Sequence, residues 1–309
     1  MTKTLLSVVI CTHNPRPAWI IRVLEALRAQ TLPKEHWELI AVDNRSADPL
    51  EGRLDVSWQP AGRVIREETL GLTPARLRGI REARGDLLVF VDDDNLLDRD
   101  FLEQALRIAE ERPWLGAWSG QCRPEFETDP PEWTRRYWGS LVIRSLDRDV
   151  WSNIPRLADT MPCGAGLCVR RGVAEEYLRL HDEGVRRFQF DRTGDSLVSG
   201  GDNDLAGCAC EVGLGVGLVA DLKLVHLIPA SRLTLEYLMR LTEGIHFSST
   251  LLDKVWGLEP ARRGAIGKLA DKVRIYREKP PHREMLRAAF RGRDRALAML
   301  EDKTLAGPQ

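Results

Sequence analysis

The sequence predicts an α/β protein with a mainly parallel sheet, and three observations lead to this prediction. Short apolar runs that fit buried strands alternate with segments whose apolar residues recur at helical spacing. Strands joined by helices in this way usually pair in parallel through right-handed crossovers. Three of the runs end in polar clusters, at residues 12–14, 43–46 and 92–95. Parallel strands would bring these clusters to one edge of the sheet.

The elements are predicted in order from the pattern of apolar residues and the breaks between them. Strands are expected at residues 5–11, 37–42, 63–66, 87–91 and 116–121, with helices at residues 17–30, 73–84 and 101–109. Later in the chain, an apolar segment is expected at 161–169, helices at 173–181 and after Gly201, two strands around 217–227, and helical structure from 234 to about 303. Between the two groups, residues 123–159 are rich in aromatics, which fill cores in most proteins but also stack on sugars.

The strand at residues 87–91 ends in Asp92, Asp93, Asp94 and Asn95. Three adjacent carboxylates repel one another unless a cation lies among them. Oxygen ligands suit Mg²⁺ or Mn²⁺, and these ions often share their coordination shell with substrate phosphates. The alternative is a helix cap by Asp94 or Asn95, which accounts for one acid and not for three.

A second acidic cluster, Asp202, Asn203 and Asp204, follows Gly200 and Gly201 and opens a predicted helix. A carboxylate in such a position is suited to take the proton of an attacking hydroxyl group. Asp204 is also suited to cap the helix, which is a purely structural role.

Charge and cysteine content indicate which partners and which cellular compartment to expect. The 309 residues include 45 Lys and Arg against 46 Asp and Glu, a balance that gives no support to a nucleic-acid partner. The six cysteines lack the spacing of zinc or redox sites, as expected for free thiols in a reducing compartment. No signal peptide precedes Leu5, and no apolar run approaches the roughly 20 residues that span a bilayer. A cytoplasmic protein is therefore expected.

The charge is uneven along the chain. Residues 254–309 hold 14 Lys and Arg against 7 Asp and Glu, a net charge of +7. The last predicted helix combines arginines with apolar residues at helical spacing, namely Arg287, Arg291, Arg293 and Arg295 beside Leu286, Phe290 and Leu297. Such basic helices suggest peripheral contact with the inner face of a membrane. The alternative is that the helix packs on the rest of the protein and its arginines face solvent.

Five motifs taken together resemble glycosyltransferase family 2. They lie at residues 7–14, 42–46, 71–79, 92–94 and 200–204. Each motif is weak alone, whereas five in order at the expected separations are specific. The resemblance covers residues 5 to about 247. It implies a GT-A fold, in which a mainly parallel, Rossmann-like sheet is flanked by helices, here with a C-terminal helical extension.

The resemblance also implies a domain organisation. Residues 1–230 would form the catalytic domain, with a nucleotide-binding half at 1–122 and an acceptor-binding half at 123–230. The helical extension would occupy residues 231–309.

Carried over position by position, the resemblance places Thr12, Asn14, Asp43 and Arg76 around the base and ribose of a nucleotide. Asp92, Asp93 and Asp94 form the family's DxD motif. In that motif Asp92 and Asp93 contact the donor sugar nucleotide, and Asp92 and Asp94 hold the metal ion, Mn²⁺ or Mg²⁺.

Two further positions match late motifs of the family. Asp202 falls at the acid that acts as the base toward the acceptor. His226 is similar to a histidine that completes the metal shell in many members, although a structural histidine is an equally reasonable reading. Thr69, Leu77 and Gly201 depart from the pattern, because the family usually has asparagine at the first two positions and often an acid at the third.

These roles imply an inverting glycosyltransferase. It would move a sugar from a nucleotide diphosphate sugar, a UDP-sugar being favoured, to a hydroxyl group of a saccharide or lipid-linked acceptor in polysaccharide or glycoconjugate synthesis. The cation would neutralise the leaving diphosphate. Asp202 would take the proton of the attacking hydroxyl group, and one displacement would invert the anomeric carbon.

Two alternatives remain open from the sequence. A nucleotidyltransferase would share the sheet and the metal-binding acids, but it should carry a Gly-rich, basic loop after the first strand, where this chain has residues 12–15, Thr-His-Asn-Pro. A non-catalytic nucleotide-sugar-binding protein is the second alternative, since the three departures would fit a lost activity. The retention of Asp92, Asp94 and Asp202 argues against that loss.

Overall fold

The structure is a computed structural model that describes residues 5–155, 159–186, 188, 190 and 198–301. The chain divides into two compact units. The first comprises Met1–Glu127, Val142–Arg187 and Gly201–Ile228, and the second comprises Thr128–Leu141, Phe188–Gly200 and Pro229–Gln309.

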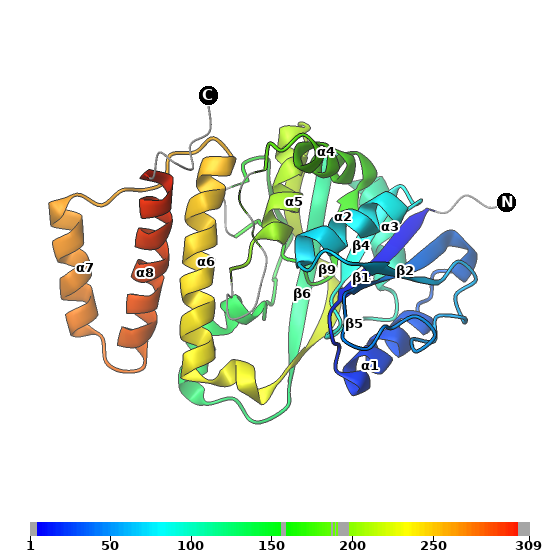
Figure 1. The fold of residues 1–309 in the computed structure, drawn as a ribbon, viewed down its shortest axis with the longest axis horizontal. Coiled ribbons are helices and arrows are strands. Elements are labelled where there is room, and N and C mark those ends of the chain that lie inside the picture. The colour runs from blue at the N-terminus through cyan, green and yellow to red at the C-terminus, as the bar shows by residue number, and fades with distance from the viewer. Residues whose placement is uncertain (1–4, 156–158, 187, 189, 191–197, 302–309) are drawn as a thin grey trace. The chain divides into compact units, whose positions relative to one another are not determined.

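The first unit is built on one nine-stranded sheet (Figure 1). Its strands are β1 (Leu6–Thr12), β2 (Trp37–Asn44), β3 (Arg63–Glu67), β4 (Leu87–Val91), β5 (Asn95–Leu97), β6 (Leu115–Phe126), β7 (Val150–Ser152), β8 (Leu167–Arg170) and β9 (Gly215–Ile228). They follow the order β3-β2-β1-β4-β8-β6-β9-β5, and β7 pairs with β9. The helices of this unit are α1 (Pro17–Arg28), η1 (Lys34–His36), α2 (Leu72–Glu82), α3 (Phe101–Glu111), α4 (Arg171–Asp182) and α5 (Gly201–Glu211).

The predicted α/β class with a sheet flanked by helices is confirmed, and the strand directions refine it. Strands β3, β2, β1 and β4 are parallel. Strand β8 runs antiparallel to both β4 and β6, whereas β6 and β9 are parallel to each other. The short strands β5 and β7 are both antiparallel to β9. Parallel pairing therefore prevails in the N-terminal part of the sheet, where the strand-helix alternation of the sequence is regular.

Strand β1 shows why these strands read as continuous apolar runs. Successive side chains of a strand point to opposite faces of the sheet. Val8 and Ile10 belong to the core that also contains residues of α1 and α3. Val9 faces the other way, against Gly79 of α2, where a Cβ atom would lie only 2.4 Å from a Val9 methyl group. Because helices cover both faces, every position of the strand favours an apolar residue.

Two predicted elements differ from the structure. The two strands expected around residues 217–227 are one strand, β9, of 14 residues. Asn95, which was a candidate helix cap, begins β5 and lies opposite His226 in the pairing of β5 with β9. Helix α3 begins only at Phe101. The cap interpretation of Asn95 is therefore wrong.

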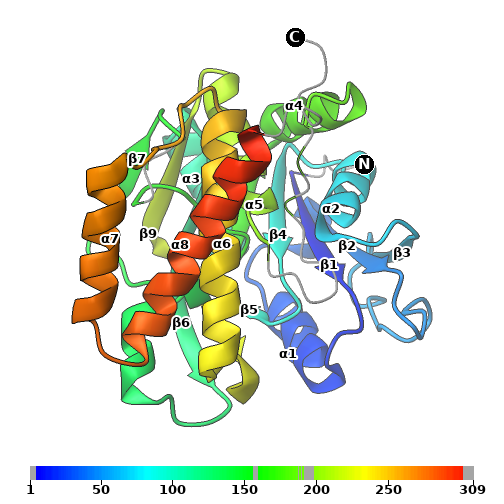
Figure 2. The same ribbon diagram turned by 60° about the vertical axis from the view of Figure 1, so that its left-hand side comes forward.

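The second unit is helical among the residues that the structure describes. Its elements are η2 (Glu132–Leu141), η3 (Ala230–Leu233), α6 (Leu235–Val255), α7 (Ala265–Arg277) and α8 (His282–Glu301). Figures 1 and 2 show α7, α8 and α6 side by side. The long helical segment expected from the sequence is thus three helices, with prolines between them. No helix in the described part of the chain has the length and apolar composition needed to cross a membrane.

Helices α6 and α8 pack closely because glycine and alanine lie between them. Met285, Ala288 and Ala296 of α8 are buried. A Cβ atom at Gly292 would lie 2.1 Å from the carbonyl oxygen of Glu243 in α6, so the two backbones meet at this glycine. Small residues therefore form much of the buried face of α8.

Candidate active site

The ends of three neighbouring strands bring the first predicted site residues together. Strand β1 lies between β2 and β4, and the register pairs Thr12 with Asp43. The Thr12 hydroxyl group donates a hydrogen bond to the Asp93 carboxylate, just after β4. This is the edge where ligands of parallel sheets bind.

Asp43 shapes the turn that follows β2. Its carboxylate accepts hydrogen bonds from the Ser46 amide (2.8 Å) and the Leu50 amide (3.1 Å) and forms an ion pair with Arg66 Nη1 (2.8 Å). Burial would raise the pKa of Asp43, but these hydrogen bonds outweigh burial and hold the pKa below its usual range. Arg45 adopts a left-handed φ of 55° inside this turn. The turn is therefore fixed by one ionised side chain.

A second set of contacts fixes the turn after β1. The Asn14 amide donates to Ser46 Oγ (2.9 Å), and Asn14 Oδ1 accepts from the Ala47 amide (2.8 Å). His13 Nδ1 donates to the Asn44 carbonyl oxygen (2.8 Å). The two turns are therefore held together, and His13 remains at their exposed rim.

Asn44 links these turns to the start of α2. Its side chain donates to the Thr69 carbonyl oxygen (2.7 Å) and accepts from the Gly71 amide (2.8 Å). Gly71 has a φ of 141°, which strongly favours glycine. Since Thr69 contributes its backbone oxygen to Asn44, its departure from the family pattern leaves this link intact.

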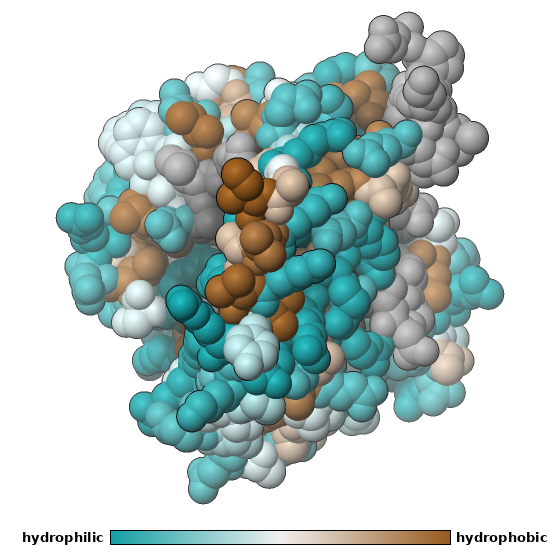
Figure 3. Space-filling model, turned by 90° about the vertical axis from the view of Figure 1, so that its left-hand side faces the viewer, coloured by the Kyte–Doolittle hydropathy of each residue, from teal (hydrophilic) through white to brown (hydrophobic). Residues whose placement is uncertain are grey.

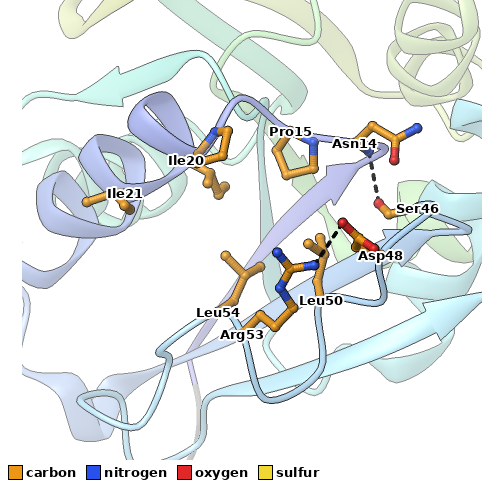
Figure 4. Close-up of a pocket in the computed structure, with 10 residues that line it drawn as sticks. Asn14, Pro15, Ile20, Ile21, Ser46, Asp48, Leu50, Arg53 and Leu54 are labelled. Atoms are coloured by element: carbon orange, nitrogen blue, oxygen red, sulfur yellow. Dashed lines mark hydrogen bonds and ion pairs between the residues drawn. The ribbon is translucent and has the colours of Figure 1, made fainter.

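A pocket of about 310 Å³ borders the same turns (Figure 4). Asn14 and Ser46 line it, and Asp48 forms an ion pair with Arg53 (3.2 Å) at its wall. Apolar side chains of α1 and of the segment after Asp48 complete the lining, among them Ile20, Leu50 and Leu54.

The acids after β4 lie against β9. Asp94 is buried, and its Oδ2 atom lies 3.4 Å from His226 Nε2. The other carboxylate oxygen accepts from the Asn95 side chain (3.0 Å), and the Asp94 carbonyl oxygen accepts from the Leu227 amide (2.8 Å). The fold thus places Asp94 next to His226, although the two residues are far apart in the sequence.

The surroundings of Asp92 disfavour the charged form of its carboxylate. Burial raises its pKa, and the neighbouring charge of Asp94 raises it further, while Arg76 and His226 act in the opposite direction. A bound cation would lower the pKa of such a carboxylate.

The donor set here suits a hard divalent ion that shares its shell with a substrate. Among the described residues, no group of three His, Cys, Asp or Glu side chains is arranged to hold a metal ion by itself. Mg²⁺ is often bound by only one or two carboxylates plus substrate phosphates. Asp92 and Asp94 fit that arrangement, and His226 adjoins it.

Asp202 opens α5 and is oriented by the segment before β8. Its Oδ2 atom accepts a hydrogen bond from the Gly164 amide (2.6 Å). Next to it, Asn203 donates to the Pro162 carbonyl oxygen (2.9 Å). Two contacts therefore fix the start of α5, and Asp202 is only partly buried.

Arg76 of α2 lies among the acids. Its side chain is buried, and a Cβ atom at Gly164 would be 3.0 Å from Arg76 Nη2 and 3.3 Å from Asp202 Oδ2. Burial alone would lower the pKa of Arg76, but Asp202 and Asp92 outweigh burial and raise it. One buried guanidinium group therefore interacts with the two acidic clusters that the sequence presents separately.

Asp204 lies in the protein interior behind Asp202. It is 1% exposed, and its Oδ1 atom lies 3.0 Å from Arg186 Nε. Arg186 also binds Glu211 through Nη2 (2.6 Å). Burial raises the pKa of Asp204 to about 6, against the opposing effect of Arg186. Asp204 is the fourth residue of α5, so it lies inside the helix and not at the cap position that the sequence suggested. Its carboxylate pairs with Arg186 in the interior, and a role in supporting α5 stays a prediction.

Three contacts of the predicted site residues are not indicated by any local spacing in the sequence. They are the Gly164 amide on Asp202, the Arg66 ion pair with Asp43 and the Arg186 ion pair with Asp204. In each case the partners are 18 or more positions apart, outside any local spacing pattern. Only the two glycines at 164 and 166 hinted at a close approach.

A profile of the family described as Glycosyl transferase family 2 matches residues 7–177. The relatives include the putative glycosyltransferase EpsH of Bacillus subtilis, 33% identical over 114 residues, which are 35% of this chain and 31% of that protein. Another is the putative teichuronic acid biosynthesis glycosyltransferase TuaG of the same organism, 31% identical over 121 residues, with 38% and 47% covered. The chain spans less than half of the length of these two relatives.

Solved structures share the fold at low sequence identity. The mannosyltransferase PcManGT of Pyrobaculum calidifontis, solved with GDP-Man and Mn²⁺, has a TM-score of 0.53 at 18% identity and covers all of this chain and 77% of its own. TarS residues 1–349 of S. aureus have a TM-score of 0.52 at 15% identity, with 98% and 92% covered. A further structure of TarS contains UDP-GlcNAc.

Proposed function

Since the chain belongs to glycosyl transferase family 2, we propose that it transfers a sugar from a nucleotide diphosphate sugar to an acceptor hydroxyl group with inversion of the anomeric carbon. The observation that carries the proposal is that the buried side chain of Arg76 lies close to Asp202, beside Gly164, and interacts electrostatically with both Asp202 and Asp92. A donor-binding acid and a candidate base thus share one charged site. Inverting transfer requires both, with the base opposite the leaving group.

We place the nucleoside against the turns after β1 and β2. Thr12, Asn14 and Asp43 lie there, beside the pocket lined by Asn14 and Ser46. A UDP-sugar is the donor we favour, and the GDP-Man complex of the mannosyltransferase makes a GDP-sugar the competing choice. The acceptor we favour is a saccharide or lipid-linked saccharide in polysaccharide synthesis.

Each charged residue has one task in this proposal. Asp92 and Asp94 would hold Mn²⁺ or Mg²⁺, with His226 beside them and Asp93 toward the donor. The ion would supply positive charge to the leaving diphosphate. Arg76 balances the charges of Asp92 and Asp202, and Asp202 accepts the acceptor proton while the Gly164 amide keeps its carboxylate oriented.

Calorimetry and a transfer assay test this proposal. UDP- and GDP-sugars are titrated with and without Mn²⁺ into the natural protein and the Asp94→Ala variant, and turnover is measured as release of nucleotide diphosphate. We expect Mn²⁺-dependent binding that Asp94→Ala abolishes. Asp221→Ala is the matched control, because Asp221 is 66% exposed and forms a surface ion pair with Arg107.

The outcomes separate the alternatives. Binding without turnover on any acceptor, including water, would favour a non-catalytic binding protein. Unchanged Mn²⁺-dependent affinity in Asp94→Ala would show that the acids after β4 do not hold the metal.

A further inference from the structure

Helix α7 presents apolar side chains to solvent along one side. Ile266, Leu269, Val273 and Tyr276 are 86%, 62%, 45% and 84% exposed. Their spacing of three, four and three residues places them on one stripe of the helix. Figure 3 faces this helix and shows a brown ridge bordered by teal, hydrophilic residues.

The stripe is unusual for this protein. The described part of the chain has eleven large apolar side chains that are exposed. Four of these eleven lie on α7, a helix of 13 residues. Single exposed apolar residues are normal, whereas a contiguous patch rimmed by polar residues marks an interaction surface.

Basic residues border the stripe on both sides. At 100° per residue, Lys272 lies beside Tyr276 on one side, and Arg277 and Arg274 lie on the other. The acid of this helix, Asp271, is buried and forms ion pairs with Arg263 (3.5 Å) and Arg293 (3.3 Å). The exposed charge around the stripe is therefore positive.

The charge pattern argues against a second copy of the chain as the partner. The apolar spacing is that of a short coiled-coil seam, with Lys272 and Arg277 at the flanking positions that face each other between helices. Two copies would bring these like charges together, which opposes pairing. An anionic partner is favoured instead.

We propose that the apolar stripe of α7 docks this protein on an anionic membrane surface. Thirteen residues of helix are about 20 Å long, which is less than the roughly 30 Å hydrocarbon core. The helix would lie in the interface, with Ile266, Leu269 and Val273 among acyl chains, Tyr276 at headgroup level, and the basic residues on lipid phosphates.

The inference assigns this role to α7 and not to α8. Arg291 and Arg295 of α8 form ion pairs with Glu243 (3.0 Å and 3.2 Å), and Arg293 pairs with Asp271. The buried face of α8 is against α6. Three of the arginines that suggested membrane contact from the sequence are thus engaged within the helical unit.

Vesicle sedimentation of the full chain tests the proposal without donor or acceptor, so its outcome is independent of the proposed activity. The probes are vesicles of phosphatidylcholine alone and vesicles that also contain phosphatidylglycerol. We expect binding only to the anionic vesicles, and loss of it as salt rises from about 0.1 M to about 1 M, where the Debye length falls from about 10 Å to about 3 Å.

Two double variants measure separately how the apolar and the basic residues of α7 contribute to vesicle binding. Ile266→Ser/Leu269→Ser should weaken binding on the order of 10²-fold, because it removes two exposed apolar anchors. Lys272→Glu/Arg277→Glu should weaken it at least tenfold. Ile154→Ser and Lys223→Glu, at exposed positions of the first unit, are the matched controls and should bind like the natural protein.

Circular dichroism establishes that each variant is folded. Absence of binding to anionic vesicles, or binding that survives both α7 variants, would overturn the proposal. So would a dimer in solution that Ile266→Ser/Leu269→Ser dissociates, because the stripe would then belong to a second copy.

Discussion

The Gly164 amide donates a 2.6 Å hydrogen bond to the carboxylate of Asp202. This contact ties the start of α5 to the segment that precedes β8. The bond holds one carboxylate oxygen of the candidate base, Oδ2, against the backbone. The Arg76 guanidinium group is close to the same glycine, so the side chains of Asp202 and Arg76 both pack against Gly164.

Replacing Asp202 by asparagine tests its role as the base. Asparagine keeps the shape and can still accept the hydrogen bond from Gly164, but it cannot take a proton. We expect turnover to fall by a factor on the order of 10² to 10⁴ with donor affinity retained. Titration calorimetry and steady-state kinetics measure the two quantities. A larger loss of turnover in Asp204→Asn, with stability preserved, would exchange the roles of the two acids.

Gly164→Ala tests the close packing around the base. The added methyl group would meet Arg76 Nη2 at 3.0 Å and Asp202 Oδ2 at 3.3 Å, so both groups must move by a few tenths of an ångström. We expect kcat to fall by about tenfold, because small displacements of catalytic groups are costly. Gly172→Ala in α4 is the control, since its methyl group meets nothing within 4 Å. Equal kcat values for the two variants would show that the site tolerates the shift.

Glu38 gives a prediction on pH. It is fully buried in β2 and accepts hydrogen bonds from Ser7 (2.7 Å), Arg63 (2.7 Å) and the Arg84 amide (2.6 Å). Burial raises its pKa, but the hydrogen bonds outweigh burial and lower it below the usual value. A lowered folded-state pKa stabilises the protein above the unfolded pKa of about 4.3, and this stability is lost as the pH falls through the folded pKa.

The comparison of Glu38→Gln with the natural protein measures this effect. At pH 7 the variant should lose about 2 kcal/mol in the free energy of unfolding, and the difference should shrink below pH ~4. Urea unfolding at a series of pH values gives both results. Glu35→Gln, at an exposed position nearby, should change neither. A difference that stays constant with pH would mean that the charge of Glu38 does not stabilise the fold.

Strands that are buried on both faces can be predicted from the sequence. Strands that are defined mainly by their hydrogen-bonded neighbour in the sheet are missed or given wrong bounds. Strands β1, β2 and β4 are apolar runs because helices cover both sides of them. Strand β5 has three residues, and only its pairing with β9 defines it. Strand β9 reads as two because its middle is exposed at Asp221, next to an irregularity of the pairing with β6.

The acids of the candidate site were visible in the sequence because they follow strands or open a helix. Their partners were not visible. Arg186 meets Asp204, and Gly164 meets Asp202, only after the chain folds. The exposed stripe of α7 was also missed, since apolar residues at helical spacing ordinarily indicate a buried face.

The ion pair of Arg186 with Asp204 tests how the interior supports Asp202. Arg186→Met would leave the Asp204 carboxylate buried without its counter-charge, and its pKa would rise further above about 6. The loss of a partner in a buried pair costs about 3–5 kcal/mol, so we expect a marked fall in thermal stability. Turnover should fall with it, since α5 carries Asp202 two positions away.

A second substitution separates structure from chemistry. If Asp204 serves only to support α5, Arg186→Met/Asp204→Leu should recover most of the stability, because it replaces both charges by apolar groups. Arg179→Met is the control on α4, since Arg179 is 49% exposed and pairs with Glu176 and Glu183 at the surface, where ion pairs contribute about 0–1 kcal/mol. Thermal melting and turnover are measured for all three variants. Recovery of melting temperature with turnover still absent would mean that Asp204 has a catalytic task beyond holding the helix that carries Asp202.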